Sequence, residues 1–413
     1  MSGETNVLVA QSGGPTTVIN ASLAGVIDQV IGTKRIDKIY GSMNGIQGVL
    51  NDNLVPLHQI FDNHKERLDL LKVTPSMFLG SCRYKLPSID SESNDYETIF
   101  RIFETYQIRY FFYIGGNDSM DTVAKLSQYA KEHDYDITIM GVPKTIDNDL
   151  IGIDHTPGFG SAAKFIASSV LEMAHDTAIY DMESVLIIEI MGRNAGWLTA
   201  SSALARNNYS NAPHLIYLPE RPFSTEQFVE DIKKQLQERK QVIVAVSEGI
   251  HDVNGEYVSA KSMKTDQFGH VMLSGTGKYL EGIVQEQIGC KVRSIELNVL
   301  QRCAAHIASQ TDIDEAFQLG REAVKAALDG HTREMVVLTR VANNPYQVEY
   351  STIDIDQVAN HEKKIPQEWI NIEGNDVTDA MIEYLKPLVV GEVQHRYQEG
   401  MPMYLSIRDF ITE

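Results

Sequence analysis

Two aspartates and a lysine follow an apolar stretch near the middle of the chain. Residues 137–140 (ITIM) have the composition of a strand, and residues 141–149 (GVPKTIDND) follow at once. The proline fixes its own backbone angle and favours extended geometry before it, so we expect the strand to end here. Asp147 and Asp149 would point the same way in an extended chain, with Lys144 beside them. A carboxylate can take a proton from a hydroxyl, and a phosphoryl donor needs positive charge and usually a metal. The stretch could supply parts of both, although a polar turn with solvated aspartates is the simpler alternative.

Two glycine-rich turns that follow apolar strands could bind phosphate groups. Residues 6–10 (NVLVA) precede residues 12–14 (SGG), and residues 110–114 (YFFYI) precede residues 115–119 (GGNDS). A helical pattern comes next in both places, so backbone N–H groups at the helix start can hold phosphate oxygens. Either turn alone is a weak signal, because many such turns use glycine only for steric reasons. The second turn also carries Asp118, whose carboxylate suits a helix N-terminus but would repel a bound phosphate.

Four arginines stand where they could bind anionic groups. Arg83 lies among small residues, and Arg193 follows the apolar strand pattern of residues 185–190. Ligand contacts in α/β folds gather at the carboxyl ends of strands, which favours a role for Arg193. Arg293 and Arg302 lie near a further strand end and could add phosphate contacts, although surface positions fit their spacing equally well.

Strand and helix patterns alternate along most of the chain. Over about 330 residues this alternation predicts mainly parallel sheets covered by helices, and the number of units indicates two sheets. Residues 224–227 (STEQ) form a capping box that predicts the start of a helix. The tail from about Tyr346 carries no chemistry that the sequence identifies.

The composition excludes some classes of partner. The 413 residues contain 36 Lys and Arg against 56 Asp and Glu, a net charge of −20, which argues against binding to nucleic acid or to an anionic membrane. An anionic small substrate would need local convergence of a few cations. The three cysteines, at positions 82, 290 and 303, have no metal-ligand spacing and fit a reducing compartment. With no apolar run near the ~18 residues of a membrane span and no signal-like start, we expect a cytoplasmic protein.

Five motifs, considered together, resemble the phosphofructokinase family in content, order and spacing. The resemblance extends over roughly residues 5–340. It implies two Rossmann-like three-layer α/β/α domains with mainly parallel sheets and an active site in the cleft between them. We assign 1–158 plus 301–350 to a donor (pyrophosphate)-binding domain, and 159–300 plus 351–413 to a sugar-phosphate-binding domain with a C-terminal extension. The motifs are residues 12–14, 80–83 (GSCR), 115–119, 143–149 and 191–193 (MGR).

The resemblance implies a reaction and a role for each motif residue. The reaction is transfer of a phosphoryl group to the 1-hydroxyl of fructose 6-phosphate, a step of glycolysis and gluconeogenesis, with Mg²⁺. Asp147 would be the general base. The other catalytic residues would be Lys144, Asp118 and Arg193; Gly13, Arg83 and Gly116 would bind the donor; and Asn117 and Asp149 would hold the metal. The sugar-phosphate pocket would comprise Thr145, Ile146, Met191, Gly192, Glu248, Arg302 and, less strongly indicated, Arg293. Some phosphate contacts in this family come from a neighbouring subunit, which implies a homodimer or homotetramer.

Two positions indicate the phosphoryl donor. Members of the family that use ATP have glycine where Asp118 and Lys144 stand here, and members that use pyrophosphate have aspartate and lysine. The Asp118 carboxylate would crowd and repel the α-phosphate of ATP, whereas Lys144 can reach the compact pyrophosphate. The resemblance therefore favours pyrophosphate and a reversible reaction. The alternatives are an ATP-dependent 6-phosphofructokinase and a non-catalytic regulator that binds a sugar phosphate.

Three positions depart from the family pattern. Asn117 replaces an aspartate associated with the metal, which leaves a neutral oxygen ligand. Val299 stands where many members have a histidine near the sugar phosphate, and Ser184 where bacterial ATP-dependent members carry an arginine from the adjoining subunit. The 6-phosphate pocket is therefore the part least defined by the sequence, and sedoheptulose 7-phosphate could also fit.

Overall fold

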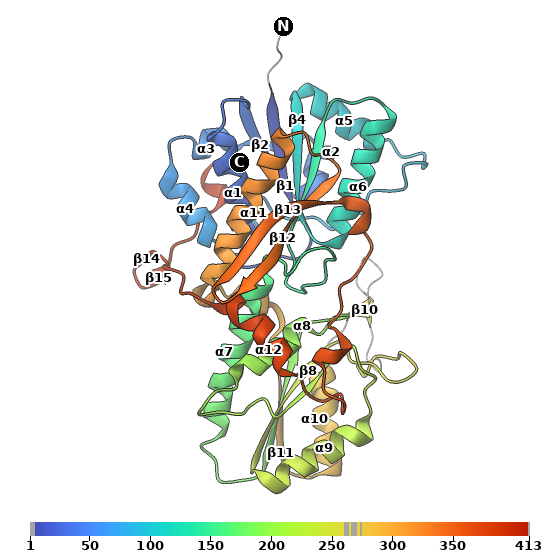
Figure 1. Cartoon of the computed structure of the whole chain (residues 1–413), viewed down its shortest axis with the longest axis vertical. Coiled ribbons are helices and arrows are strands. Elements are labelled where there is room, and N and C mark those ends of the chain that lie inside the picture. The colour runs from blue at the N-terminus through green and yellow to red at the C-terminus, as the bar shows by residue number, and fades with distance from the viewer. Residues whose placement is uncertain (1–4, 260–263, 266–270, 273–274, 412–413) are drawn as a thin grey trace.

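The chain forms two α/β domains stacked end to end, as the computed structural model shows in Figure 1. The structure describes residues 5–259, 264–265, 271–272 and 275–411. Each domain has its own sheet, and both sheets are built mainly from parallel strands, with helices on their faces. The predicted fold class is confirmed. Within the described residues, no helix is both long enough and apolar enough to cross a lipid bilayer.

The first domain is built on a seven-stranded sheet in the order β13-β12-β5-β4-β1-β2-β3. Its central strands β1, β4 and β5 are mostly apolar and are buried along most of their length, as expected for parallel strands covered on both faces. Only the outer strands β3 and β13 run antiparallel to their neighbours. The strands are β1 (Asn6–Gln11), β2 (Lys38–Ser42), β3 (Leu54–Pro56), β4 (Ile108–Gly115), β5 (Thr138–Pro143), β12 (Glu334–Asn343) and β13 (Tyr346–Asp354).

Helices pack closely on this sheet. α1 and α11 approach each other so tightly that a Cβ on Gly25 would lie 1.9 Å from the Phe317 carbonyl oxygen, so only glycine fits there. The aromatic residues Tyr96, Phe100 and Phe103 of α5 are buried in the core, as their helical spacing predicts. The helices are α1 (Ile19–Ile31), α2 (Gly45–Leu50), α3 (Leu57–Phe61), α4 (Lys65–Val73), α5 (Asp95–Thr105), α6 (Asn117–Glu132) and α11 (Gln310–Leu328).

The second domain has a four-stranded parallel sheet in the order β11-β6-β8-β7. The predicted helix start at α9 is confirmed, because the Ser224 hydroxyl accepts a hydrogen bond from the backbone N–H of Gln227. The reciprocal bond of a capping box is replaced, since the side-chain amide of Gln227 donates to Asp231. The strands are β6 (Ser184–Ile190), β7 (Leu215–Tyr217), β8 (Gln241–Ser247) and β11 (Lys291–Glu296). The helices are α7 (Phe159–Thr177), α8 (Trp197–Ser201), α9 (Thr225–Glu238), α10 (Thr276–Gln287) and α12 (Asp379–Leu385). Two short strand pairs lie outside these sheets: β9 (Lys264–Thr265) with β10 (Val271–Met272), and β14 (Tyr397–Gln398) with β15 (Met401–Pro402).

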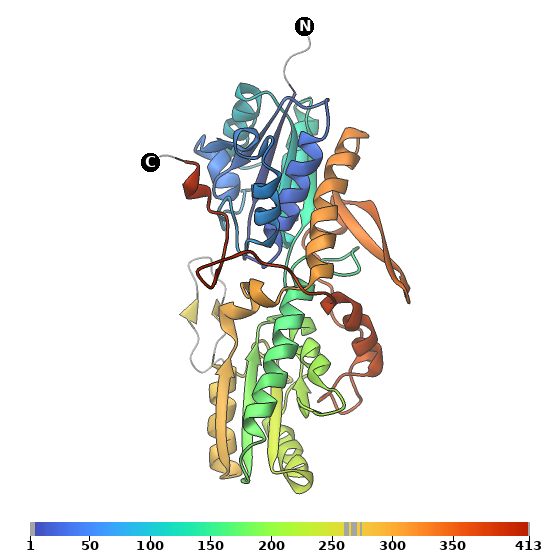
Figure 2. The ribbon, with the colours of Figure 1, turned by 90° about the vertical axis from the view of Figure 1, so that its left-hand side faces the viewer.

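The C-terminal tail passes between the domains more than once (Figure 2). After β13, Ile355 and Val358 are still buried in the core of the first domain. Ile365 and α12 then pack into the core of the second domain, and Phe410 returns to the first. The tail therefore packs differently from the predicted assignment of residues 351–413 to the sugar-phosphate domain, because its apolar residues are divided between two cores.

Candidate active site

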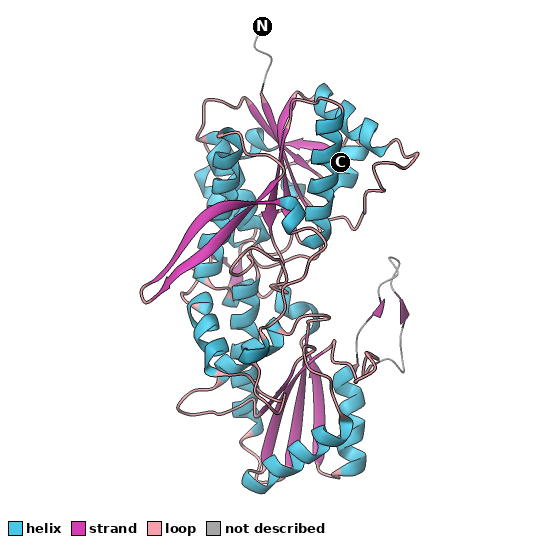
Figure 3. Cartoon of the chain, turned by 45° about the vertical axis from the view of Figure 1, so that its right-hand side comes forward, coloured by secondary structure: helices cyan, strands magenta, loops and turns pink. Residues whose placement is uncertain are grey.

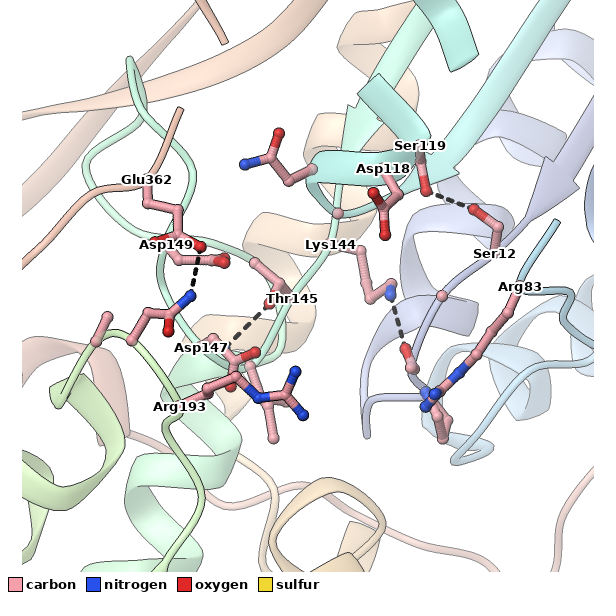
Figure 4. Close-up of a pocket in the computed structure, with 18 of the residues that line it drawn as sticks. Ser12, Arg83, Asp118, Ser119, Lys144, Thr145, Asp147, Asp149, Arg193 and Glu362 are labelled. Atoms are coloured by element: carbon pink, nitrogen blue, oxygen red, sulfur yellow. Dashed lines mark hydrogen bonds between the residues drawn. The ribbon is translucent and has the colours of Figure 1, made fainter. Parts of the chain in front are cut away.

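A cleft of about 910 Å³ lies between the two domains and is lined by residues of both. It gathers most of the predicted site residues, several of which Figure 4 shows as sticks. Gly192 lies behind the cleft wall, and Arg293 lies elsewhere. The predicted residues that line the cleft are Gly13, Arg83, Gly116, Asn117, Asp118, Lys144, Thr145, Ile146, Asp147, Asp149, Met191, Arg193, Glu248 and Arg302.

The register of the parallel strands brings three motifs to one edge of the first sheet. Gln11 at the end of β1 pairs with Ile114 of β4, and Gly115 of β4 pairs with Pro143 of β5. The chain leaves each strand at this edge. The two glycine turns and the loop of residues 144–154 after β5, called here the aspartate loop, therefore become neighbours. The hydroxyls of Ser12 and Ser119 lie 2.5 Å apart and join the two glycine turns directly. The predicted pair of phosphate-binding turns therefore forms a single surface.

Asp118 and Lys144 both project into this cleft (Figure 4). Lys144 is only 2% exposed, and its ammonium donates a 2.6 Å hydrogen bond to the carbonyl oxygen of Gly14. A Cβ on Gly13 would lie 3.3 Å from that ammonium, so the glycine gives the lysine room. Burial lowers the pKa of Lys144 to about 8, although the carboxylates of Asp147 and Asp149 oppose the shift. The Asp118 carboxylate, in the second glycine turn, and the Lys144 amine, bonded to the first, thus line the same cleft.

Asp147 has the properties of a proton acceptor near neutral pH. Its backbone N–H donates to the hydroxyl of Thr145 at 3.1 Å, which fixes the turn of the loop. Desolvation, and then the nearby Asp149 carboxylate, raise the pKa of Asp147 to about 7, while Lys144 and two arginines act in the opposite direction. A base is most effective when its pKa is close to the working pH, so this environment suits Asp147 to proton transfer.

The second domain contributes the opposite wall through the loops after β6 and β8. Gly192 has a φ of +138°, a conformation that favours glycine, and its carbonyl oxygen accepts a 2.5 Å hydrogen bond from the hydroxyl of Ser247. The N–H of Gly192 donates to Glu248 at 3.4 Å, and Gln301 holds the N–H of Met191 at 3.2 Å. Burial raises the pKa of Glu248 to about 7. Gly192 thus shapes the wall from which Met191 and Glu248 face the cleft.

The predicted metal ligands differ in how much of their bonding capacity is used. The amide oxygen of Asn117 accepts the N–H of Asn360 at 2.6 Å, and its amide nitrogen donates to the carbonyl of His361 at 2.7 Å. An aspartate could not make the second bond, which explains asparagine at this position. By contrast, the Oδ1 atom of Asp149 is buried and has no hydrogen-bond partner. This oxygen is therefore available to bind a cation. In the described part of the chain, no cluster of three or more His, Cys, Asp or Glu side chains could hold an ion alone.

The two arginines predicted to bind the sugar phosphate lie in different places. Arg302 lines the cleft, and its guanidinium would lie 3.5 Å from a Cβ on Gly14. Arg293 lies on the outer strand β11, paired with Leu186, and is exposed outside the cleft. Val299, one of the three positions that depart from the expected pattern, is 48% exposed. Only one of the two predicted arginines therefore reaches the cleft of this chain.

One segment that lines the cleft lies far from all the sequence motifs. Asn360, His361 and Glu362 all contribute to the wall, and Glu362 accepts a 2.8 Å hydrogen bond from the side chain of Asn194. Residues 360–364 (NHEKK) form a polar run between apolar residues, which in the sequence is typical of an exposed loop. Their contacts with the cleft are too distant in sequence for a local pattern to indicate them.

The fold and the cleft define a class of protein. Two parallel α/β domains enclose two glycine turns, a carboxylate with a pKa near neutrality, and several cationic side chains that can neutralise phosphates. These are the parts that transfer of a phosphoryl group to a hydroxyl requires, so the molecule is a two-domain α/β phosphotransferase.

Comparison with known proteins places the chain within that class. The family model described as Phosphofructokinase matches residues 6–327, and the chain belongs to the phosphofructokinase family. It is 40% identical to the pyrophosphate–fructose 6-phosphate 1-phosphotransferase of Halomonas elongata, over 96% of this chain and 94% of that protein. A relative of the same name from Xanthomonas campestris pv. campestris is also 40% identical, over 98% and 96%. The crystal structure of a pyrophosphate-dependent phosphofructokinase from Marinobacter aquaeolei superimposes with a TM-score of 0.87 at 36% identity, covering 99% of this chain and 97% of that one.

Proposed function

We propose that this chain is a pyrophosphate-dependent 6-phosphofructokinase that reversibly transfers a phosphoryl group from pyrophosphate to the 1-hydroxyl of fructose 6-phosphate. The observation that carries the proposal is the pair Asp118 and Lys144, both of which face the cleft beside the glycine turns. Relatives with this activity in their names match nearly the whole chain.

The donor is selected by charge and by space. Lys144 makes one hydrogen bond to a carbonyl oxygen, which leaves donors that can turn to a pyrophosphate oxygen. Asp118 is exposed in the first turn of α6, where an α-phosphate continuing into a nucleoside would meet a negative charge. Arg83, which also lines the cleft, would bind the donor together with the backbone at Gly13 and Gly116. A compact diphosphate satisfies these groups better than ATP does.

The chemical step uses groups that line the cleft. Asp147 takes the proton of the sugar 1-hydroxyl as the hydroxyl oxygen bonds to the nearer phosphorus of pyrophosphate. The bond from that phosphorus to the bridging oxygen breaks, and inorganic phosphate leaves with the electron pair. Arg193 and Lys144 offset the charge that develops on the transferring group. In the reverse direction Asp147 returns the proton to the sugar oxygen.

Mg²⁺ is the metal that we propose for this site. Asp149 fits it best, because its Oδ1 atom is buried without a partner, whereas the oxygen of Asn117 already accepts a hydrogen bond. The donor would supply further oxygen ligands, since the chain offers few. When bound, the ion would neutralise charge on the diphosphate.

The sugar phosphate would bind to the wall contributed mainly by the second domain. Thr145, Ile146, Met191 and Glu248 would surround the sugar, positioned by Gly192, and Arg302 would contact the 6-phosphate. We propose that Arg293 acts in the cleft of a partner subunit, which makes the enzyme a homodimer or homotetramer. The first domain would then bind the donor and the second the sugar, in a cytoplasmic enzyme whose three cysteines are unpaired.

Steady-state kinetics with each donor tests the proposal. Purified protein with fructose 6-phosphate and Mg²⁺ should turn over pyrophosphate at least a hundredfold more efficiently than ATP. Release of fructose 1,6-bisphosphate identifies the product, and sedoheptulose 7-phosphate serves as a competing acceptor. Efficient turnover with ATP alone would overturn the assignment of the donor. Absence of turnover with either donor, combined with tight binding of fructose 6-phosphate, would instead indicate a regulatory protein.

A further inference from the structure

The segment of residues 358–365, called here the crossing segment, joins the two cores along the wall of the cleft. Val358 is buried in the first domain and Ile365 in the second. Between them, Asn117 at the start of α6 binds the backbone of Asn360 and His361 through both ends of its side-chain amide. The crossing segment lies beyond the residues matched by the family model, which end at position 327. It therefore lies outside the part of the chain that carries the sequence motifs.

Lys363 in this segment connects the aspartate loop to the second domain through its main chain. Its N–H donates a 2.7 Å hydrogen bond to the carbonyl of Asp149, and its carbonyl accepts one from the indole N–H of Trp197 at 3.0 Å. Trp197 is the first residue of α8 and is buried in the second core. The main chain of Lys363 thus bonds the aspartate loop to the second domain.

The ammonium of Lys363 donates three hydrogen bonds to residues of the same loop. It donates to the side-chain oxygen of Asn148 at 3.2 Å, to the carbonyl of Ile153 at 3.2 Å and to the carbonyl of Asp154 at 2.7 Å. An ammonium has three donors, so its hydrogen-bonding capacity is filled by acceptors from residues 148–154. A neutral side chain of similar length would leave those three acceptors without the donor.

Asn148 is the residue through which these contacts act on the two aspartates. It lies between Asp147 and Asp149, is fully buried, and has a φ of +54°. This left-handed conformation is uncommon outside glycine and persists where surrounding contacts hold it. Tyr384 of α12 accepts a 2.9 Å hydrogen bond from the side-chain amide of Asn148, and its own hydroxyl donates to Asp154 at 2.8 Å. Two side chains of the C-terminal tail therefore hold the residue that sets the directions of Asp147 and Asp149.

We propose that Lys363 is a positioning residue for phosphoryl transfer, assisted by Tyr384. By fixing Asn148, it holds the Asp147 carboxylate toward the sugar hydroxyl and the Asp149 carboxylate toward the donor side of the cleft. The C-terminal tail is then part of the catalytic apparatus and does more than join the domains. This inference rests on the proposed function for its kinetic consequence, but the ordering of the loop can be measured without it.

The test compares Lys363→Met with Lys364→Met. Both variants lose one ammonium at adjacent positions, but Lys364 is exposed and lies outside the cleft lining. We expect Lys363→Met to lower kcat with pyrophosphate by about 10- to 100-fold, while the KM for fructose 6-phosphate changes less than threefold. Lys364→Met should behave as the wild type. Tyr384→Phe, which removes one hydroxyl, should lower kcat by about three- to tenfold and remains informative if Lys363→Met fails to fold.

Hydrogen–deuterium exchange separates this inference from the proposed function. In Lys363→Met or Tyr384→Phe, peptides covering residues 144–154 should exchange at least tenfold faster than in the wild type, with β8 unchanged. If the wild type fails to turn over pyrophosphate, the proposed function falls, and the exchange result still decides whether the tail orders the loop. The inference is overturned if the loop exchanges as in the wild type, or if kcat is retained in folded Lys363→Met. A loss of stability with kcat unchanged would make Lys363 a purely structural link.

Discussion

The two ends of the cleft are built in different ways. At the donor end, two glycine turns and the aspartate loop lie on adjacent parallel strands and are bonded directly to one another. Of the two arginines proposed to hold the 6-phosphate, Arg302 lines the cleft, with its guanidinium 3.5 Å from where a Cβ on Gly14 would lie, whereas Arg293 lies exposed on the outer strand β11. The groups proposed to bind the donor thus meet within one chain, whereas one of the two arginines proposed for the second phosphate lies outside the cleft of that chain. The contrast separates groups that strand register brings together from a group that would reach a cleft only in the proposed oligomer.

The strongest test of the donor end is removal of the proposed base. Asp147→Asn keeps the size of the side chain but removes the proton acceptor, so kcat should fall by about 10²–10⁴-fold, the usual contribution of a positioned base. The KM for fructose 6-phosphate should change little. Steady-state kinetics on the folded variant measures both values. A kcat close to that of the wild type would remove Asp147 from its role.

Replacement of both Asp118 and Lys144 by glycine should have the next largest effect on catalysis. Asp118→Gly combined with Lys144→Gly removes a repulsive carboxylate and the amine that faces the glycine turns. The ratio of kcat/KM for pyrophosphate to that for ATP should fall by at least about 10²-fold, since a change of about 2.7 kcal/mol in relative transition-state energy corresponds to that factor. Each single variant serves as a control for additivity. An unchanged ratio would mean that other residues select the donor.

The acceptor end is tested by comparing the two arginines. Arg302→Met should raise the KM for fructose 6-phosphate by about 10- to 100-fold, because loss of one partner from a charge-assisted phosphate contact costs ~2 kcal/mol or more. Arg293→Met should raise it by about tenfold if a partner subunit brings this arginine into the cleft. Size-exclusion chromatography with light scattering measures the assembly. A KM unaffected by Arg293→Met in an oligomer would place the 6-phosphate within one chain.

A smaller effect, on the pH dependence of the free energy of unfolding, is expected for His155 next to the aspartate loop. His155 is 2% exposed and lies between Glu315 at 2.6 Å and Asp154 at 2.8 Å. Burial disfavours the charged ring, but the two carboxylates outweigh it and raise the pKa of His155 from 6.5 to about 9. Its contribution to folding is therefore complete below about pH 6.5 and is lost as the pH rises through 9.

Urea denaturation of the wild type and His155→Gln measures this contribution. The free energy of unfolding of the wild type should exceed that of the variant most at pH 6, and the difference should shrink by roughly 3 kcal/mol by pH 9. His155, Asp154 and Glu315 lie next to the aspartate loop. The result therefore shows how much the ion pairs of His155 contribute to the stability of the fold around that loop. A difference that stays constant over this range would mean that folding does not raise the pKa of His155.

Much of the fold and site could be predicted because the signals are local. The apolar strands, the glycine turns at their ends and the serine N-cap of α9 each occupy fewer than about ten residues, and the structure contains all of them. Strands that run in parallel present their carboxyl ends at one edge, so the aspartate loop and the glycine turns had to meet. The tail was harder to predict, because its apolar residues give no sign of which core each one joins.

The sequence by itself determined the parallel α/β architecture and the content of the donor end, including Asp118, Lys144, Asp147 and Asp149. Tertiary structure alone decided that Asn117 binds the crossing segment, that Lys363 and Tyr384 hold Asn148, and that Arg293 lies outside the cleft. The physical reason is the range of the interactions. A turn or a strand end depends on neighbours a few residues away, whereas Lys363 and Asn148 are 215 positions apart and meet only once both domains have formed.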